Sequence, residues 1–337
     1  MELTRNSPES QSEPAGTVLA GMKRWFQHSR GQNLPDALFA AFTFLCALSV
    51  LAVVALVFVE LAQNSALSMR QFGWNFFVGT DWNPVSGNFG ALPFIFGTLV
   101  SSALALALAV PLGIGAAIFL TEICPASLRA PVAYMIELLA AIPSVIYGLW
   151  GIFVLVPLLR VYVEPFLKKH FSWSGLVEGP PYGVGMLAAG VILAIMIIPF
   201  ISSITREVIL AVPKTQREAV LALGSTRWEM LRIGVIRNAR AGITGGVILA
   251  LGRALGETMA VTMLIGNRAE ISKSLLAPGY TMASVIANEF AEATENLYLS
   301  ALLEIGLALL VVTVIVNALA QLLIWSITRG HKAGAHA

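Results

Sequence analysis

Charged residues are scarce in this sequence: they make up 12% of its 337 residues, against roughly 25% in an average soluble protein. Apolar residues make up 57%, and the mean hydropathy is +0.79. The apolar residues gather in runs too long for the helices of a soluble core. This composition excludes a soluble enzyme and a disulfide-rich secreted scaffold, and it predicts an all-α membrane protein.

Cysteine and histidine are also scarce, with two and four residues. Cys46 lies in an apolar run and Cys124 in a distant loop, so we expect no disulfide. All four histidines lie outside the apolar runs, so we expect no metal site. A G-x-x-x-x-G-K-[ST] motif is absent, so we expect no nucleotide site, no cofactor and no enzyme activity. The small net charge of +2 gives no reason to expect a nucleic-acid partner.

Apolar stretches divide the chain. Six of them reach the length of about 20 residues that a membrane-spanning helix needs: 37–59, 92–120, 132–159, 183–204, 243–265 and 301–327. They predict a transmembrane domain over residues 37–327, between an N-terminal tail, 1–36, and a C-terminal tail, 328–337. The start of the chain is rich in Ser, Pro and Glu, which predicts partial disorder there.

Lysine and arginine indicate the orientation, because cytoplasmic loops of membrane proteins carry an excess of them. Fourteen of the 21 lie in the two tails and in the loops after the second and fourth stretches. Six lie in the other loops, and Arg253 lies within the fifth stretch. Both termini are therefore predicted to be cytoplasmic, as an even number of spans requires.

The longest cytoplasmic connection, residues 205–242, contains two helical patterns. The first follows Pro213 and ends at Gly224, a residue that suits a helix C-terminus. The second has apolar residues at helical spacing, at Trp228, Leu231 and Val235. Each pattern predicts either an interfacial helix on anionic lipid or a helix offered to a cytoplasmic partner.

Two ionisable residues, Arg253 and Glu257, lie near the middle of the fifth stretch. Such a residue costs roughly 2.5–3.5 kcal/mol at the bilayer centre, so another requirement must keep the two in place. Their spacing puts both on one face of a helix, where they can pair, and Gly252 and Gly256 allow another helix to approach. In one interpretation the Arg253–Glu257 pair fixes the packing of the helices. In the other, Arg253 binds a passing oxyanion, and Glu257 weakens the positive electrostatic field enough for the anion to be released.

Several segments resemble known families. Glu218-Ala219, with Gly224 five positions after the alanine, resembles the EAA loop of ATP-binding-cassette importer permeases, although Ile236-Arg237 stands where that pattern has a Leu-Pro pair. Longer segments are similar to phosphate-specific importer permeases of the PstC type. They are WNPV at 82–85, FGALPFI at 89–95, AIPSVIYGLWG at 141–151, GRALGETMAV at 252–261 and ANEFA at 287–291.

This resemblance implies the type I (MetI-like) importer permease fold, in the bacterial inner membrane. It implies that the loop with Glu218, Ala219 and Gly224 docks in a cleft of a separate ATPase, and that Arg253 and Glu257 take part in phosphate passage. The implied partners are a second related permease, a dimeric ATP-binding subunit and a periplasmic phosphate-binding protein.

The leading hypothesis is therefore a permease subunit of an ATP-driven, high-affinity phosphate importer. One alternative is a stand-alone, ion-coupled anion transporter, which predicts uptake without an ATPase and more protonatable residues along the spans than the sequence has. Another is a permease for a different oxyanion, such as molybdate or sulfate. A third, a scaffold or sensor in phosphate signalling, predicts that Arg253→Ala abolishes uptake and leaves signalling intact.

Overall fold

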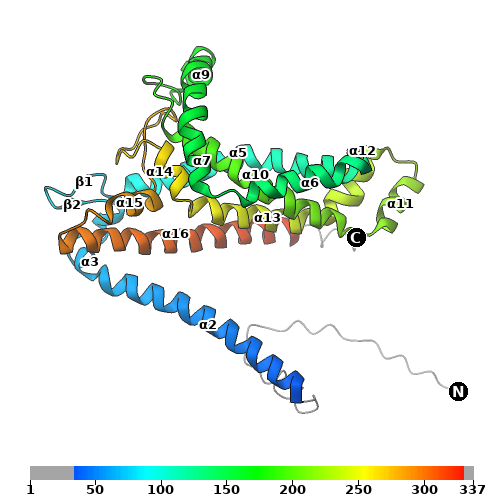
Figure 1. Ribbon diagram of the computed structural model, residues 1–337, viewed down its shortest axis with the longest axis horizontal. Coiled ribbons are helices and arrows are strands. Elements are labelled where there is room, and N and C mark those ends of the chain that lie inside the picture. Colours follow the sequence, from blue (N-terminus) through cyan, green and yellow to red (C-terminus); the bar gives the residue numbers. More distant parts are fainter. Residues whose placement is uncertain (1–33, 330–337) are drawn as a thin grey trace. The chain divides into compact units, whose positions relative to one another are not determined.

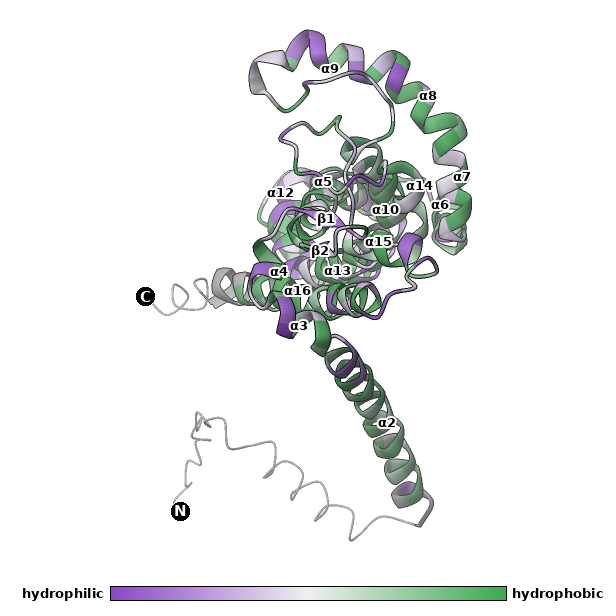
Figure 2. Ribbon diagram, turned by 90° about the vertical axis from the view of Figure 1, so that its left-hand side faces the viewer, coloured by the Kyte–Doolittle hydropathy of each residue, from purple (hydrophilic) through white to green (hydrophobic). Residues whose placement is uncertain are grey.

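The computed structural model describes residues 34–329, which are mostly helical (Figure 1). The chain divides into two units, residues 1–60 and 61–337, and each is described by itself. The first unit holds most of α2, Leu34–Asn64. Exposed apolar side chains occur along most of this helix, and its ribbon is mostly green, the colour of hydrophobic residues (Figure 2). A helix that is apolar all round suits a lipid environment.

The second unit is a bundle of helices with one small hairpin. The hairpin consists of β1, Trp82–Asn83, and β2, Asn88–Phe89, which pair antiparallel. The helices are α3 Ala66–Phe72, α4 Asn75–Val78, α5 Leu92–Ile118, α6 Ala126–Ala141, α7 Ser144–Trp150, α8 Val156–Leu158, α9 Glu164–Phe171, α10 Met186–Leu210, α11 Lys214–Ala222, α12 Arg227–Glu229, α13 Arg237–Leu255, α14 Met259–Leu264, α15 Met282–Glu289 and α16 Asn296–Arg329. Segments of π-helix occupy Phe119–Ile123, Gly151–Leu155, Leu159–Val163 and Met230–Ile236.

Five of the described helical segments are long and apolar enough to cross a membrane. They are Leu38–Asn64, Leu92–Ile123, Ser144–Phe171, Met186–Leu210 and Asn296–Leu322. The predicted first, second, fourth and sixth spans overlap the first, second, fourth and fifth of these segments. The count of six spans and the cytoplasmic location of the termini remain predictions. Residues 1–33 and 330–337 of the predicted tails lie outside the described residues.

The predicted third span, residues 132–159, is not one continuous helix. Ile142 has an extended backbone, with ψ of 129°, between α6 and α7. Pro143 explains the interruption, because a proline disfavours the helical conformation of the residue before it. From Ser144 the chain remains helical to the end of α9, and this arm projects from the bundle (Figure 1).

The predicted fifth span, residues 243–265, is also interrupted. α13 ends at Leu255 and α14 begins at Met259. Gly256 follows α13 with φ of −94° and ψ of 1°, which turns the backbone out of the helix. Arg253 and Glu257 therefore lie on the two sides of a helix end instead of along one helix.

α10 is the central helix of the second unit, and it contacts α5, α6 and α13. Small residues make the contact with α5 close. A Cβ on Gly113 of α5 would lie 2.9 Å from Ile201 Cγ2, and one on Gly190 of α10 would lie 2.4 Å from Leu104 Cδ2. Small residues at helix interfaces allow such close approach in membrane proteins.

At the end of the bundle opposite α11, aromatic residues hold the hairpin in place (Figure 1). Trp82 lies edge-on to Phe89 and Phe94. Its Nε1 donates a hydrogen bond of 2.8 Å to Glu289 Oε2, and the Tyr298 hydroxyl donates one of 2.7 Å to the same atom. The hairpin is thus tied to both α15 and α16.

Gly97 of α5 gives a test of this packing. A Cβ at this position would lie 2.0 Å from the Tyr280 carbonyl oxygen, which belongs to backbone and cannot turn aside. We expect Gly97→Ala to lower the free energy of unfolding by about 1–3 kcal/mol, because it forces packed elements apart. Denaturant unfolding of the purified chain in detergent measures this. Gly115→Ala, in the same helix with nothing within 4 Å of its Cβ, is the matched control. Equal stability of the two variants would contradict the packing.

Candidate functional site

The break between α13 and α14 separates the two predicted path residues. Arg253 lies in the last turn of α13, and Glu257 lies in the connection before α14. Within residues 34–329 no ion pair of 4.0 Å or less joins them; ion pairs there include Arg206–Glu137, Arg217–Glu122 and Arg268–Glu270. The structure thus differs from the expected pairing along one helix face.

Arg253 lies on the outward face of α13. In the single chain its side chain is exposed, and the side chain of Leu249, one turn earlier, is 60% exposed. Ala250 and Ala254 are buried in the contact with α5 and α10. The part of α13 around Arg253 is therefore open to water or to another chain on its outward face, and Arg253 places a guanidinium there.

The two glycines beside Arg253, Gly252 and Gly256, lie in different environments. A Cβ on Gly252 would lie 3.6 Å from Asn317 Nδ2 of α16, an ordinary contact distance. A Cβ on Gly256 would meet only the Gly252 carbonyl oxygen, at 3.7 Å. Gly252 thus faces α16, whereas Gly256 faces open space on the side of Arg253.

The first predicted helix of the cytoplasmic loop is α11, which follows Pro213. None of its residues is buried. Gly224 follows the helix with φ of +80°, and its N–H donates a 3.0 Å hydrogen bond to the Leu221 carbonyl. Only glycine adopts this left-handed conformation readily, so Gly224 ends the helix as the sequence predicts. Glu218 and Ala219 are exposed, which leaves them available to a partner.

One side of α11 is held against the helix that leads into α13. A Cβ on Gly234 would lie 3.3 Å from Val220 Cγ2, so α11 sits very close to this helix. Asn238 Nδ2 donates a 2.8 Å hydrogen bond to Gln216 Oε1. These contacts fix the position of α11 and leave its other side free.

Arg217 joins α11 to the ends of two long helices. Its Nη1 lies 2.8 Å from Glu122 Oε1, in the π-helical turn after α5, and its Nη2 donates a 2.8 Å hydrogen bond to the Ile209 carbonyl of α10. The Arg217 and Glu122 side chains are 20% and 15% exposed. Sequence patterns did not predict this pair; the only signal for it was the presence of two opposite charges in loops of the same predicted side.

The second predicted helix of the loop starts at a capping box, in which Thr226 Oγ1 accepts from the Glu229 N–H and Glu229 accepts from the Thr226 N–H. These bonds from Thr226 hold the pKa of Glu229 below its usual value. The chain stays helical through Ile236-Arg237 into α13, so no break occurs where the family pattern has a Leu-Pro pair.

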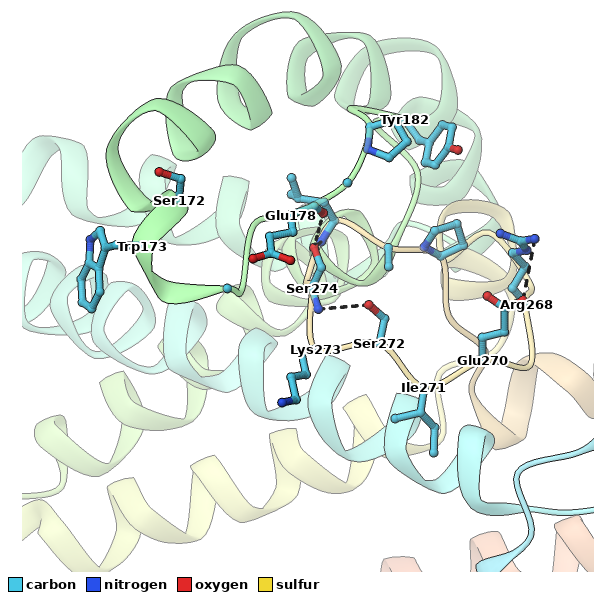
Figure 3. A pocket seen from close by; sticks show the side chains of 16 residues that line it. Ser172, Trp173, Glu178, Tyr182, Arg268, Glu270, Ile271, Ser272, Lys273 and Ser274 are labelled. Carbon is cyan, nitrogen blue, oxygen red and sulfur yellow. Dashed lines mark hydrogen bonds and ion pairs between the residues drawn. The ribbon is translucent and has the colours of Figure 1, made fainter.

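A large hollow lies at the end of the bundle away from α11, between residues 172–182 and residues 268–278 (Figure 3). Its volume is about 930 Å³. Arg268 lies 3.7 Å from Glu270, and Lys273 lies apart from them. Trp173, at its edge, is 83% exposed. An open hollow with an exposed aromatic side chain and charges of both signs is suited to binding the surface of another protein. Within residues 34–329 no group of three His, Cys, Asp or Glu side chains could hold a metal ion.

Comparisons with known proteins agree with this architecture. The family model described as "Binding-protein-dependent transport system inner membrane component" matches residues 109–329. The phosphate transport system permease protein PstC of Mesorhizobium japonicum is 50% identical, over 87% of this chain and 91% of that protein. The corresponding protein of Xylella fastidiosa strain 9a5c is 48% identical, over 89% and 94%.

A solved bacterial ABC transporter involved in the import of the acidic polysaccharide alginate aligns with a TM-score of 0.59 and 18% identity, over 90% of this chain and 99% of that chain. This similarity shows the fold alone, and it confirms the predicted all-α fold of the importer permeases. With its apolar helices the chain is a multi-pass component of the inner membrane. The chain belongs to the family of binding-protein-dependent transport system inner membrane components and, within it, to the PstC permeases.

Proposed function

We propose that this chain is the permease subunit of an ATP-driven, high-affinity importer of inorganic phosphate, and that it forms half of the translocation path. The observation that supports this most is an exposed arginine at a helix break, with no carboxylate partner in the described part of the chain. It occurs in a chain that is 50% identical to a phosphate permease. A guanidinium offers forked donors that match phosphate oxygens.

In this proposal Arg253 binds phosphate transiently and Glu257 limits how tightly it is held. A path needs binding that is strong enough for entry and weak enough for release. An unopposed arginine in a low-dielectric path would hold a divalent anion strongly, because Coulomb attraction rises as water is excluded. A carboxylate four residues away, separated by the helix break, lowers the local potential without occupying the guanidinium donors.

In the same proposal, three other elements bind the partners. The exposed side of α11, with Glu218 and Ala219, docks on a dimeric ATP-binding subunit, where hydrolysis takes place. The outward face of α13 meets a second, related permease. The hollow of Figure 3 receives a periplasmic phosphate-binding protein. The alginate transporter with the same fold has been solved in complex with a periplasmic protein that carries alginate pentasaccharide, which supports this arrangement.

Substitution of Arg253 tests the path. We expect Arg253→Ala to reduce phosphate uptake about 10- to 100-fold, the loss that follows from removing a hydrogen-bonded charge, and Arg253→Lys to keep part of it. Radiolabelled phosphate uptake in cells that lack the native gene and carry each variant measures this, with sulfate uptake in parallel. Arg70→Ala, an exposed arginine of α3, is the control. Normal phosphate uptake by Arg253→Ala would show that the arginine takes no part in the path. Recovery of sulfate uptake in place of phosphate uptake would contradict the assignment of phosphate as the substrate.

Substitution of Glu218 tests the docking helix. We expect Glu218→Arg to abolish uptake and to prevent co-purification of the ATP-binding subunit, because it reverses a charge on the exposed side of α11 without touching the core. Glu207→Arg makes the same charge reversal at an exposed site on α10. This variant is expected to keep both phosphate uptake and co-purification of the ATP-binding subunit. Co-purification that is unaffected by Glu218→Arg would place the docking surface elsewhere.

Substitution of Arg217 separates docking from transmission. We expect Arg217→Gln and Glu122→Gln each to lower uptake while the ATP-binding subunit still co-purifies, because the link from α11 to the ends of α5 and α10 is lost. Each leaves a half-buried charge and lowers the free energy of unfolding by about 1–3 kcal/mol. The exchanged pair, Glu122→Arg with Arg217→Glu, is expected to recover part of the loss. Additive defects in the exchanged pair would show that the two residues do not act together.

A further inference from the structure

A second hollow, of about 540 Å³, lies beside the helix that runs from α12 into α13, on the side predicted to be cytoplasmic. Its lining residues are Trp228, Glu229, Arg232, Ile233, Arg237 and Arg240. The opposite face of this helix is buried, since Leu231, Val235 and Ala239 belong to a core cluster with Ile209 and Val212. The helix is thus anchored on one face and presents a basic, partly apolar face outward.

The hollow carries a net positive charge. Arg232, Arg237 and Arg240 have no carboxylate partner within 4.0 Å among the described residues, where the ion pairs involve other arginines. The one carboxylate in the lining, that of Glu229, offsets one of the three positive charges and is held by Thr226. Its Oε2 accepts hydrogen bonds of 2.8 Å and 2.9 Å from the N–H and the hydroxyl of Thr226. Three guanidiniums are therefore left for an anion.

The apolar lining distinguishes one anion from another. Trp228 is 65% exposed and Ile233 is 48% exposed, in the same hollow as the arginines. Free phosphate gains nothing from an exposed indole, whereas a phospholipid presents a phosphate together with glycerol and acyl carbons. Tryptophan is enriched at the interface of membrane and water for this reason.

The position of the hollow along α13 is consistent with lipid binding. The predicted fifth apolar stretch begins at Ile243, which lies about 9 Å along the helix from Arg237 at 1.5 Å per residue. Arg240 lies between them. On the predicted span and orientation, the arginines lie just outside the hydrocarbon, at the level of the headgroups of the cytoplasmic leaflet.

We propose that this hollow binds the headgroup of an anionic phospholipid, with its phosphate on the three arginines and its glycerol and upper acyl chain against Trp228 and Ile233. The site is independent of the path at Arg253. Because α11 packs on the same helix at Gly234, a bound lipid also reduces the mobility of the helix that supports α11. Basic clusters next to membrane helices commonly attract anionic lipid.

Fluorescence quenching in nanodiscs tests the site on the complete transporter. We expect brominated phosphatidylglycerol to quench tryptophan fluorescence more than brominated phosphatidylcholine at equal content, and Trp228→Phe to remove the excess. Arg232→Gln and Arg237→Gln are each expected to raise the phosphatidylglycerol content needed for half of the excess about fivefold. Arg227→Gln removes the same charge from an exposed neighbour that does not line the hollow, and it is expected to behave as the unsubstituted chain.

Three outcomes would overturn the proposal. One is equal quenching by the two lipids. Another is loss of the excess when inorganic phosphate is added, which would identify a site for the free anion. The third is an excess in the isolated chain that vanishes in the complete transporter, which would show that the ATP-binding subunit covers the arginines. Unchanged elution of each variant in size-exclusion chromatography verifies that it is folded.

Discussion

The close contact of α5 with α10 is the constraint on which the end of the bundle that holds α11 depends. Gly113 and Gly190 leave room for Ile201 and Leu104, so the two helix axes run as near to each other as side chains allow. Without a hydrophobic effect between helices in lipid, such close packing supplies the attraction. A bulkier residue at either glycine would separate the helices along their whole length and not only at one point.

This packing brings two acceptors together for Arg217. The Glu122 carboxylate follows α5 and the Ile209 carbonyl belongs to α10, and one guanidinium contacts both. The planar guanidinium holds its Nη1 and Nη2 donors in a fixed fork, one for each acceptor. The same residue lies on α11, so the packing of α5 and α10 sets the position of α11. Movement imposed on α11 would pass directly to these two helices.

The sequence predicts the elements that depend on local signals. The apolar stretches of α2, α5, α10 and α16, the end of α11 at Gly224 and the buried positions Leu231 and Val235 all follow from periodicity or from a single residue type. The break at Ile142 had a visible cause in Pro143, but a proline in an apolar helix produces a mild kink as often as an interruption. The Arg217–Glu122 pair joins loops that are far apart in sequence, and spacing within one chain carries no signal for such a contact.

The break after α13 explains how two charges can occupy an apolar segment without pairing. Arg253 lies in the last turn of α13, where unpaired carbonyls carry a partial negative charge, and Glu257 lies just before α14, where N–H groups carry a positive one. Each helix end contributes about 0.3–1 kcal/mol, which is less than the roughly 2.5–3.5 kcal/mol that such a residue costs in the bilayer. The difference must come from water or from a polar group of another chain on the outward face of α13. A continuous helix would let the two side chains neutralise each other, whereas the break keeps the guanidinium free of Glu257 and leaves its stabilisation to whatever contacts that face.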